Sequence, residues 1–64
     1  MPWTTDRYPV SMRNLSAPTR EKAIEIANAL LAEQMDEGMA IRVAITKAKQ
    51  WARRRGLAVF QYED

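Results

Sequence analysis

The stretch QMDEG (residues 34–38) separates two long segments that both have helical periodicity. Asp36 is a suitable N-cap for the second segment, and the Glu37 carboxylate suits the positive N-terminus of a helix. A connection this short makes two helices antiparallel neighbours, an arrangement known as an αα-hairpin. We therefore predict a mainly α fold, built on a hairpin of helices at residues 17–34 and 37–55.

The segment before the break has the pattern of an amphipathic helix. Ser16 can cap it, and Pro18 suits its first turn. Apolar residues fall on one half of the helical wheel, and charged residues fall on the other half. The apolar half holds Ala23, Ile24, Ile26, Ala27, Leu30, Leu31 and Met35.

The segment after the break repeats this pattern with smaller side chains. Its apolar face holds Ala40, Ile41, Ala44, Ile45, Ala48, Trp51 and Ala52. The alanines on this face allow the two helix backbones to approach closely, while Trp51 fills the gap near one end. Gly56 suits the position after the helix, because glycine readily adopts the left-handed conformation that commonly ends one.

The two ends of the chain have a different pattern. Pro9 predicts a short helical turn over residues 9–15. Residues 2–5 and 57–62 have the composition of short strands, and they could pair as a two-stranded β patch under the hairpin. The alternative is a loose tail over residues 57–64, with only its aromatic side chains held against the core. Either arrangement gives one small domain over residues 1–64.

Composition argues against catalysis. The chain has no cysteine and no histidine, so it lacks the commonest general base and the commonest metal ligands. Glu21 and Glu25 are one turn apart, but both fall on the polar face of their helix. Helix capping accounts for Asp36 and Glu37 at the break. We therefore expect no enzymatic activity, no cofactor and no metal ion.

The chain also lacks the segments that direct a protein to a membrane. Its N-terminus has no basic region followed by an apolar core, and no apolar run approaches the roughly 20 residues needed to cross a bilayer. The absence of cysteine suits a reducing compartment. We expect a cytoplasmic protein that does not insert into membranes.

The charge pattern supplies the candidate binding site. The net charge is only +2, but the second helix has no acidic residue after Glu37. Its polar face carries Arg42, Lys47, Lys49, Arg53 and Arg54, with Thr46 and Gln50 between them. This face could contact phosphate groups.

The alternative is a solvated helix face. Cations near a helix C-terminus are stabilising, which accounts for Arg53 and Arg54. Arg42, Lys47 and Lys49 lie too early in the helix for that effect. Pairing with the acidic edge of the first helix could explain one or two of them.

We expect the aromatic residues to lie mostly in the core, because large apolar side chains are scarce in so short a chain. They are Trp3, Tyr8, Trp51, Phe60 and Tyr62. An exposed Trp3 beside Met1 and Met12 would instead form a protein-binding patch.

Four motifs together carry a family resemblance. They are MPW (residues 1–3), YPVSMRNL (residues 8–15), KAIEIANALL (residues 22–31) and DEGMAIRVAITKAKQWA (residues 36–52). As a set they resemble the N-terminal module of the small YdaT-type general-stress proteins of bacteria. More distantly, the layout is similar to the ChaB-type regulators of cation transport. The resemblance implies a small helical fold with a minor β element and brings no catalytic residue. Relatives tend to have glycine in the turn where Gln34 and Met35 stand here.

These observations favour a non-catalytic bacterial accessory protein that binds a protein partner. The family resemblance implies a role in a stress response. A nucleic-acid-binding module that uses the basic face of the second helix is the first alternative. By analogy with ChaB-type proteins, a regulator of cation transport is the second. We expect a monomer or a weak homodimer, because small domains often need a partner copy to cover apolar surface.

Overall fold

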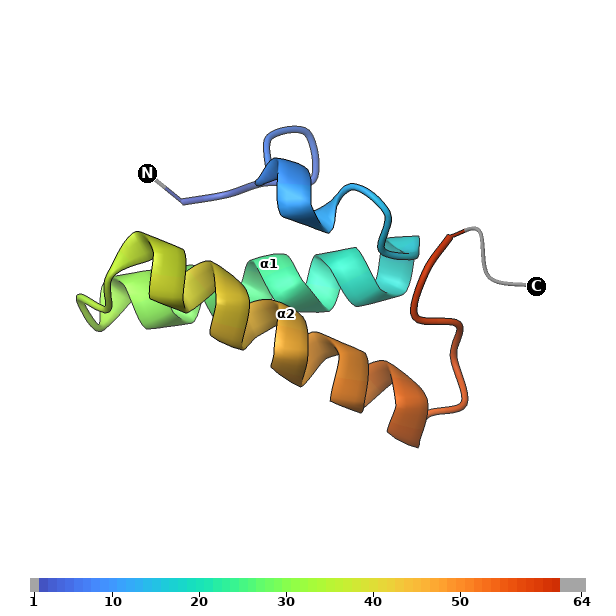
Figure 1. Cartoon of the computed structure of the whole chain (residues 1–64). Helices are drawn as coiled ribbons and strands as arrows, with labels where there is room; N and C mark the ends of the chain where they lie inside the picture. The colour runs from blue at the N-terminus through green and yellow to red at the C-terminus, as the bar shows by residue number, and fades with distance from the viewer. Residues whose placement is uncertain (1, 62–64) are drawn as a thin grey trace.

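A computed structural model of the chain, which describes residues 2–61, contains two long helices and one short one. The elements are the 3-10 helix η1 (Val10–Met12), α1 (Ala17–Ala32) and α2 (Glu37–Arg54). Figure 1 shows α1 and α2 running in opposite directions from a tight turn, with the N-terminal arm above them. The predicted mainly α hairpin is therefore confirmed. The helical turn predicted at residues 9–15 is the shorter η1.

Side-chain caps begin both long helices, as predicted. The Ser16 Oγ accepts a hydrogen bond from the Thr19 backbone N–H at 3.4 Å. The Asp36 carboxylate accepts one from the Met39 backbone N–H at 3.1 Å. Each cap satisfies a backbone donor that has no partner within the helix.

Both helices end in the same hydrogen-bonded motif, in which the residue after the C-cap is left-handed. Gly56 holds this position after α2 with φ 69°, and its N–H bonds to the Arg53 carbonyl at 3.1 Å. Gln34 holds it after α1 with φ 67°. The closing turns explain why both helices end slightly before the predicted residues 34 and 55.

Replacing Gln34 with glycine is expected to stabilise the hairpin. A side chain in the left-handed region costs about 1–2 kcal/mol, and the larger chain entropy of unfolded glycine offsets part of the gain. The free energy of unfolding in urea should therefore rise by about 1 kcal/mol. The matched control is Gly56→Ala, which has open space around the new Cβ and should lose about as much. A loss of stability in Gln34→Gly would contradict this account.

Small side chains form the contact between α1 and α2. Ala44, Ala48 and Ala52 on α2 are fully buried, as are Ala23 and Ala27 on α1. The close approach predicted from the alanine face is thus confirmed. Met12, Leu15 and Val59 complete the core from outside the hairpin. Partly buried side chains pack around it, and they are Trp3, Tyr8, Ile26, Ile41, Ile45 and Trp51.

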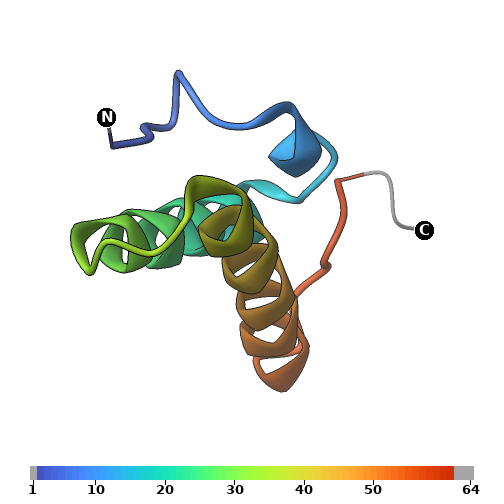
Figure 2. The same cartoon turned by 60° about the vertical axis from the view of Figure 1, so that its left-hand side comes forward.

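The predicted pairing of residues 2–5 with residues 57–62 is wrong. Residues 2–61 contain no strand, and residue 62 lies outside the described range. The tail instead returns to the start of α1, which Figure 2 shows from a second side. Leu15 and Phe60 form a single antiparallel bridge, and the Ser16 N–H donates to the Val59 carbonyl at 2.9 Å.

The N-terminal arm is held by different contacts. The Asn28 side chain accepts from the Trp3 N–H at 2.7 Å and donates to the Trp3 carbonyl at 2.9 Å. The next residues close a turn, in which Thr4 and Arg7 exchange backbone hydrogen bonds. These bonds use the backbone groups that a strand partner would need, which explains why the arm does not pair with the tail.

The junction of the tail with α1 also uses two hydroxyl groups. The Ser16 Oγ donates to the Ala58 carbonyl at 2.7 Å, and the Thr19 Oγ1 lies 3.2 Å from the same oxygen. Ser16 is 8% exposed and Thr19 is fully buried. Ser16 therefore caps α1 and binds the tail with one side chain.

The aromatic residues follow the core prediction only in part. Trp3, Tyr8 and Trp51 pack against the core, whereas Phe60 is 38% exposed and Tyr62 lies outside the described residues. Met12 in η1 is fully buried, so an exposed patch that includes Met12 is excluded. Met1 is also outside the described range.

Candidate binding face on α2

The core contacts of α2 decide which of its residues face outward. Ala40, Ala44, Ala48 and Ala52 occupy one side of the helix and are fully buried. Side chains about half a turn away must therefore face solvent. Of the five predicted site residues, Arg42, Lys47, Arg53 and Arg54 are exposed, and Lys49 is partly exposed.

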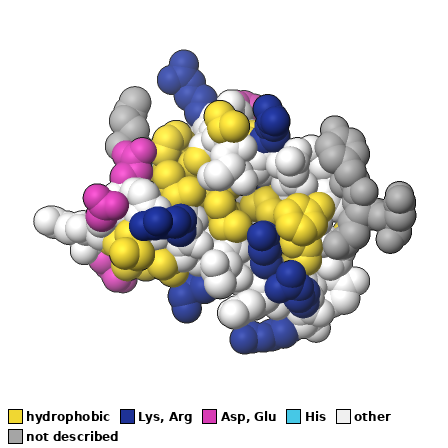
Figure 3. Space-filling view, viewed as in Figure 1, with side chains coloured by type: hydrophobic (Ala, Val, Ile, Leu, Met, Phe, Trp, Pro, Cys, Tyr) yellow, Lys and Arg dark blue, Asp and Glu magenta, His cyan; other side chains and the backbone are white. Residues whose placement is uncertain are grey.

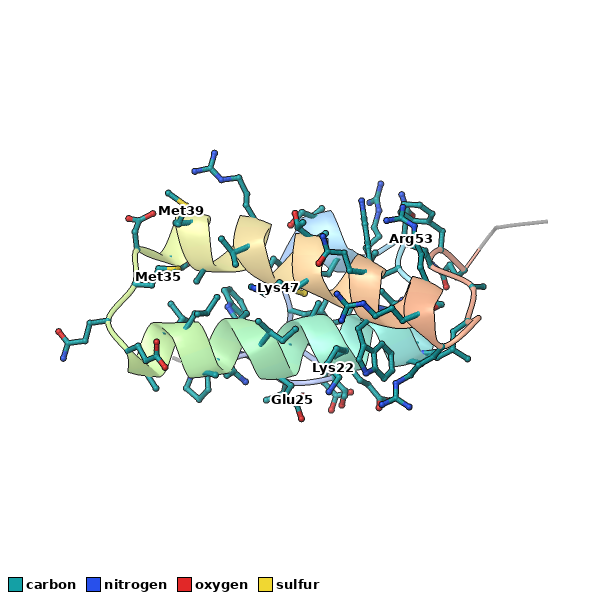
Figure 4. The ribbon with its side chains drawn as sticks, turned by 90° about the horizontal axis from the view of Figure 1, so that it is seen from below. Lys22, Glu25, Met35, Met39, Lys47 and Arg53 are labelled. Carbon is teal, nitrogen blue, oxygen red and sulfur yellow. The ribbon has the colours of Figure 1, made fainter. Side chains whose placement is uncertain are left out.

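Helical geometry arranges these cations in two rows along α2. The wheel places Arg42, Lys49 and Arg53 on one flank and Lys47 and Arg54 on the other. Figure 4 shows Lys47 on the flank nearer α1 and Arg53 on the opposite side of the helix. The predicted face is thus one continuous surface with a row of cations along each edge.

A shallow groove lies between the two rows. Its volume is about 290 Å³, and its lining residues are Arg42, Val43, Thr46, Lys47 and Gln50. Val43 gives the groove an apolar part, whereas Thr46 and Gln50 add neutral hydrogen-bonding groups. Arg42 and Lys47 place a positive charge at either side.

The predicted pairing of these cations with the acidic edge of α1 does not occur. The single ion pair among residues 2–61 joins Lys22 and Glu25 within α1, at 2.7 Å. Lys49 has a different internal contact, because its Nζ lies 5.0 Å from the centre of the Phe60 ring. Arg42 and Lys47 have neither an acidic nor an aromatic partner within the described chain.

Opposite charges gather at opposite ends of α2. Arg53 and Arg54 lie in its last turn, where the helix dipole favours cations, and Glu37 lies in its first turn. Figure 3 shows Asp and Glu side chains at the hairpin-turn end and Lys and Arg side chains around the C-terminal half of α2. The dipole explains the terminal pair, but it does not explain Arg42 and Lys47.

Two of the acidic side chains of α1 lie on its solvent-facing side. Glu21 and Glu25 are both exposed, as predicted for carboxylates on the polar face. They border a second shallow pocket of about 220 Å³ beside Trp51. Lys22 also lines this pocket, where it lies over the Trp51 ring at 5.1 Å and binds Glu25. No group of three acidic residues in the described range could hold a metal ion.

Two residues of the face were missed at the sequence level. Met39 is 45% exposed, and Val43 is partly exposed and lines the groove. They are four residues apart and fall between the cation rows, on the side of the wheel assigned to polar residues. That spacing was the available signal, since one side of a helix repeats every three to four residues.

A comparison with known proteins supports the family resemblance. Over 52 residues, or 81% of this chain, the sequence is 54% identical to the uncharacterized protein YdaT of Bacillus subtilis. The predicted resemblance to YdaT-type proteins is thus confirmed. It spans 35% of the length of YdaT. No protein-family model and no solved structure matches the chain.

The whole candidate face lies on α2. None of the helices in residues 2–61 is long and apolar enough to cross a membrane. The more distant likeness to ChaB-type proteins, with the regulation of cation transport that it implies, stays a prediction.

Proposed function

We propose that the chain is a non-catalytic bacterial accessory module of the cytoplasm that binds an acidic segment of a protein partner through the exposed face of α2. The observation that supports this most directly is the pair Arg42 and Lys47. Both are exposed and both border the groove, and neither has a partner within residues 2–61. A stress response, which the YdaT-type resemblance implies, is the setting that we propose for this binding.

The argument rests on charge complementarity. The two rows of cations present one sign of charge along the whole face, and carboxylates approaching it would meet no acidic residue of α2 after Glu37. Such a surface steers an acidic partner and disfavours a basic one. Contacts at so exposed a face are screened by salt, so the expected interaction is weak and depends on ionic strength.

Nucleic acid is the second candidate, and Thr46 and Gln50 favour it. Their side chains lie between the cation rows, where they could donate hydrogen bonds to phosphate oxygens while the cations neutralise charge. The carboxylates at the hairpin turn weigh against a long duplex, since a duplex that follows α2 would pass Asp36 and Glu37. We therefore place the acidic protein first.

Charge reversal on the face tests the proposal. The double variant Arg42→Glu/Lys47→Glu is expected to lose at least about ten-fold in affinity for short labelled poly-glutamate, since two attractive contacts become repulsive. Binding is followed by amide NMR titration at about 50 and 150 mM salt, concentrations at which surface charges are screened to different extents.

The matched control is Arg7→Glu/Arg13→Glu, which makes the same change in net charge at two exposed positions outside α2. It should keep nearly all of the affinity. Equal losses in both double variants would show that only the overall charge matters. Shifts on α2 with a DNA duplex, and none with poly-glutamate, would favour the second candidate.

A further inference from the structure

The proposed function leaves the apolar residues of the same face unexplained. Met39 is 45% exposed at the first turn of α2, and Val43 follows it one turn later in the groove. Figure 4 shows Met35 and Met39 together at the hairpin-turn end. The exposed Met39 and the partly exposed Val43 add an apolar contact beside the basic groove, which charge complementarity alone does not require.

The dimensions of the face suit one kind of ligand. From Met39 to Arg54 the face covers about 22 Å, since an α-helix rises about 1.5 Å per residue. Its first half offers apolar contact at Met39 and Val43, and its second half offers the cations of the last two turns. A complementary ligand would have apolar side chains at helical spacing and an excess of carboxylates on its flanks and toward one end.

We infer that the ligand is an acidic amphipathic helix of a protein partner, which lies along α2 with its apolar stripe on Met39 and Val43. This inference rests on the proposed function and specifies the class of partner. The acid-rich end of the partner helix lies over Arg53 and Arg54, because the carboxylates at the hairpin turn would repel it from the other end.

Two other ligands fit the face less well. A DNA or RNA duplex presents phosphates along its length, and it would leave Met39 without a favourable contact. A second copy of this chain would place the same face against itself in a two-fold dimer, so that its rows of cations would meet. The charge and the apolar residues of the α2 face together therefore favour an acidic amphipathic helix over these two ligands.

The experiment compares two peptides of identical composition. One is an acidic amphipathic helix of about four turns with leucine at every third or fourth position, and the other is its scrambled sequence without a stripe. The intact chain is titrated with each peptide by isothermal calorimetry and amide NMR. We expect the amphipathic peptide to bind about ten-fold more tightly than the scrambled one.

The double variant Met39→Ala/Val43→Ala tests the same apolar contact by changing the protein instead of the peptide. It keeps the charge and favours helix formation, so α2 should remain folded. It is expected to remove the preference for the amphipathic peptide and to leave binding of the scrambled peptide unchanged.

Each outcome decides between the two proposals. Equal affinities for both peptides, reduced alike by Arg42→Glu/Lys47→Glu, would overturn this inference and leave the proposed function standing. An unchanged preference in the Met39→Ala/Val43→Ala variant would also overturn it. Failure of both peptides to bind, with or without binding of a DNA duplex, would overturn both.

Discussion

Replacing Met12 with alanine is expected to leave much of the protein unfolded at room temperature. Met12, the last residue of η1, is fully buried and belongs to the core that joins the hairpin to the two ends of the chain. Truncating a buried methionine costs about 2–5 kcal/mol, because apolar contact is lost and a cavity remains. A domain of this size rarely has more than about 3–5 kcal/mol of stability, so the loss is comparable with the whole margin.

Urea unfolding followed by far-UV circular dichroism measures this effect. Met39→Ala is the matched control, because the same side chain is removed from a site that is 45% exposed. Its unfolding midpoint should stay close to that of the parent protein, since alanine is also a good helix former. Similar midpoints for the two variants would mean that the burial of Met12 contributes little.

Replacing Ala48 with leucine is expected to force α1 and α2 apart. Ala48 is fully buried in the middle of the contact between the helices, where neighbouring alanines leave no space for a longer side chain. Overpacking a core costs about 1–3 kcal/mol, and the cost rises when backbones must move. At Ala48 the backbone of α2 must move, because only side chains as small as alanine fit between the two helices. We expect a large fall in melting temperature and exposure of Trp51 to solvent.

The change is read by thermal denaturation and by the fluorescence of the two tryptophans. Ala29→Leu provides the control, since Ala29 is exposed on α1 and leucine is nearly as good a helix former. That variant should keep the parent melting temperature within a few degrees. A parent-like melting temperature for Ala48→Leu would show that the helices can separate at little cost.

The helices could be predicted from the sequence because local signals agreed with one another. Ser16 and Asp36 cap the two helices as expected, and Gly56 ends the second one. The alanine periodicity of the second helix identified the buried face correctly. The left-handed conformation of Gln34 was not predicted, because the first helix was expected to include this residue and its side chain does not favour that conformation.

The placement of the two ends could not be predicted in the same way. Residues 57–61 have the composition of a strand, but their partner is decided by where Val59 can enter the core and where Ser16 offers hydrogen bonds. A single bridge has no register pattern that could be read from either segment. The burial of Met12 was not predicted either, since nothing in a three-residue helix indicates which side chain faces inward.

The candidate face was predictable in its charges and less so in its apolar part. The order of cations along α2 was enough to identify Arg42 and Lys47 as unusual, because helix-dipole effects fade within the last turn. The absence of ion pairs between the two helices could be seen only in three dimensions. Val43 was assigned to the face only from the structure, in which it lines the groove between the two rows of cations.

The attachment of the tail beside Ser16 has a consequence for the order in which the chain folds and opens. Contacts within the hairpin join residues that are near in sequence, whereas the bridge from Leu15 to Phe60 closes a loop over most of the chain. Near contacts form before distant ones, so the tail docks late and is the first segment to leave. The amides of Ser16 and Gln61 should then exchange with deuterium earlier than those in the middle of α1 and α2. Each such opening uncovers Val59 and the Met12 side of the core while both helices persist.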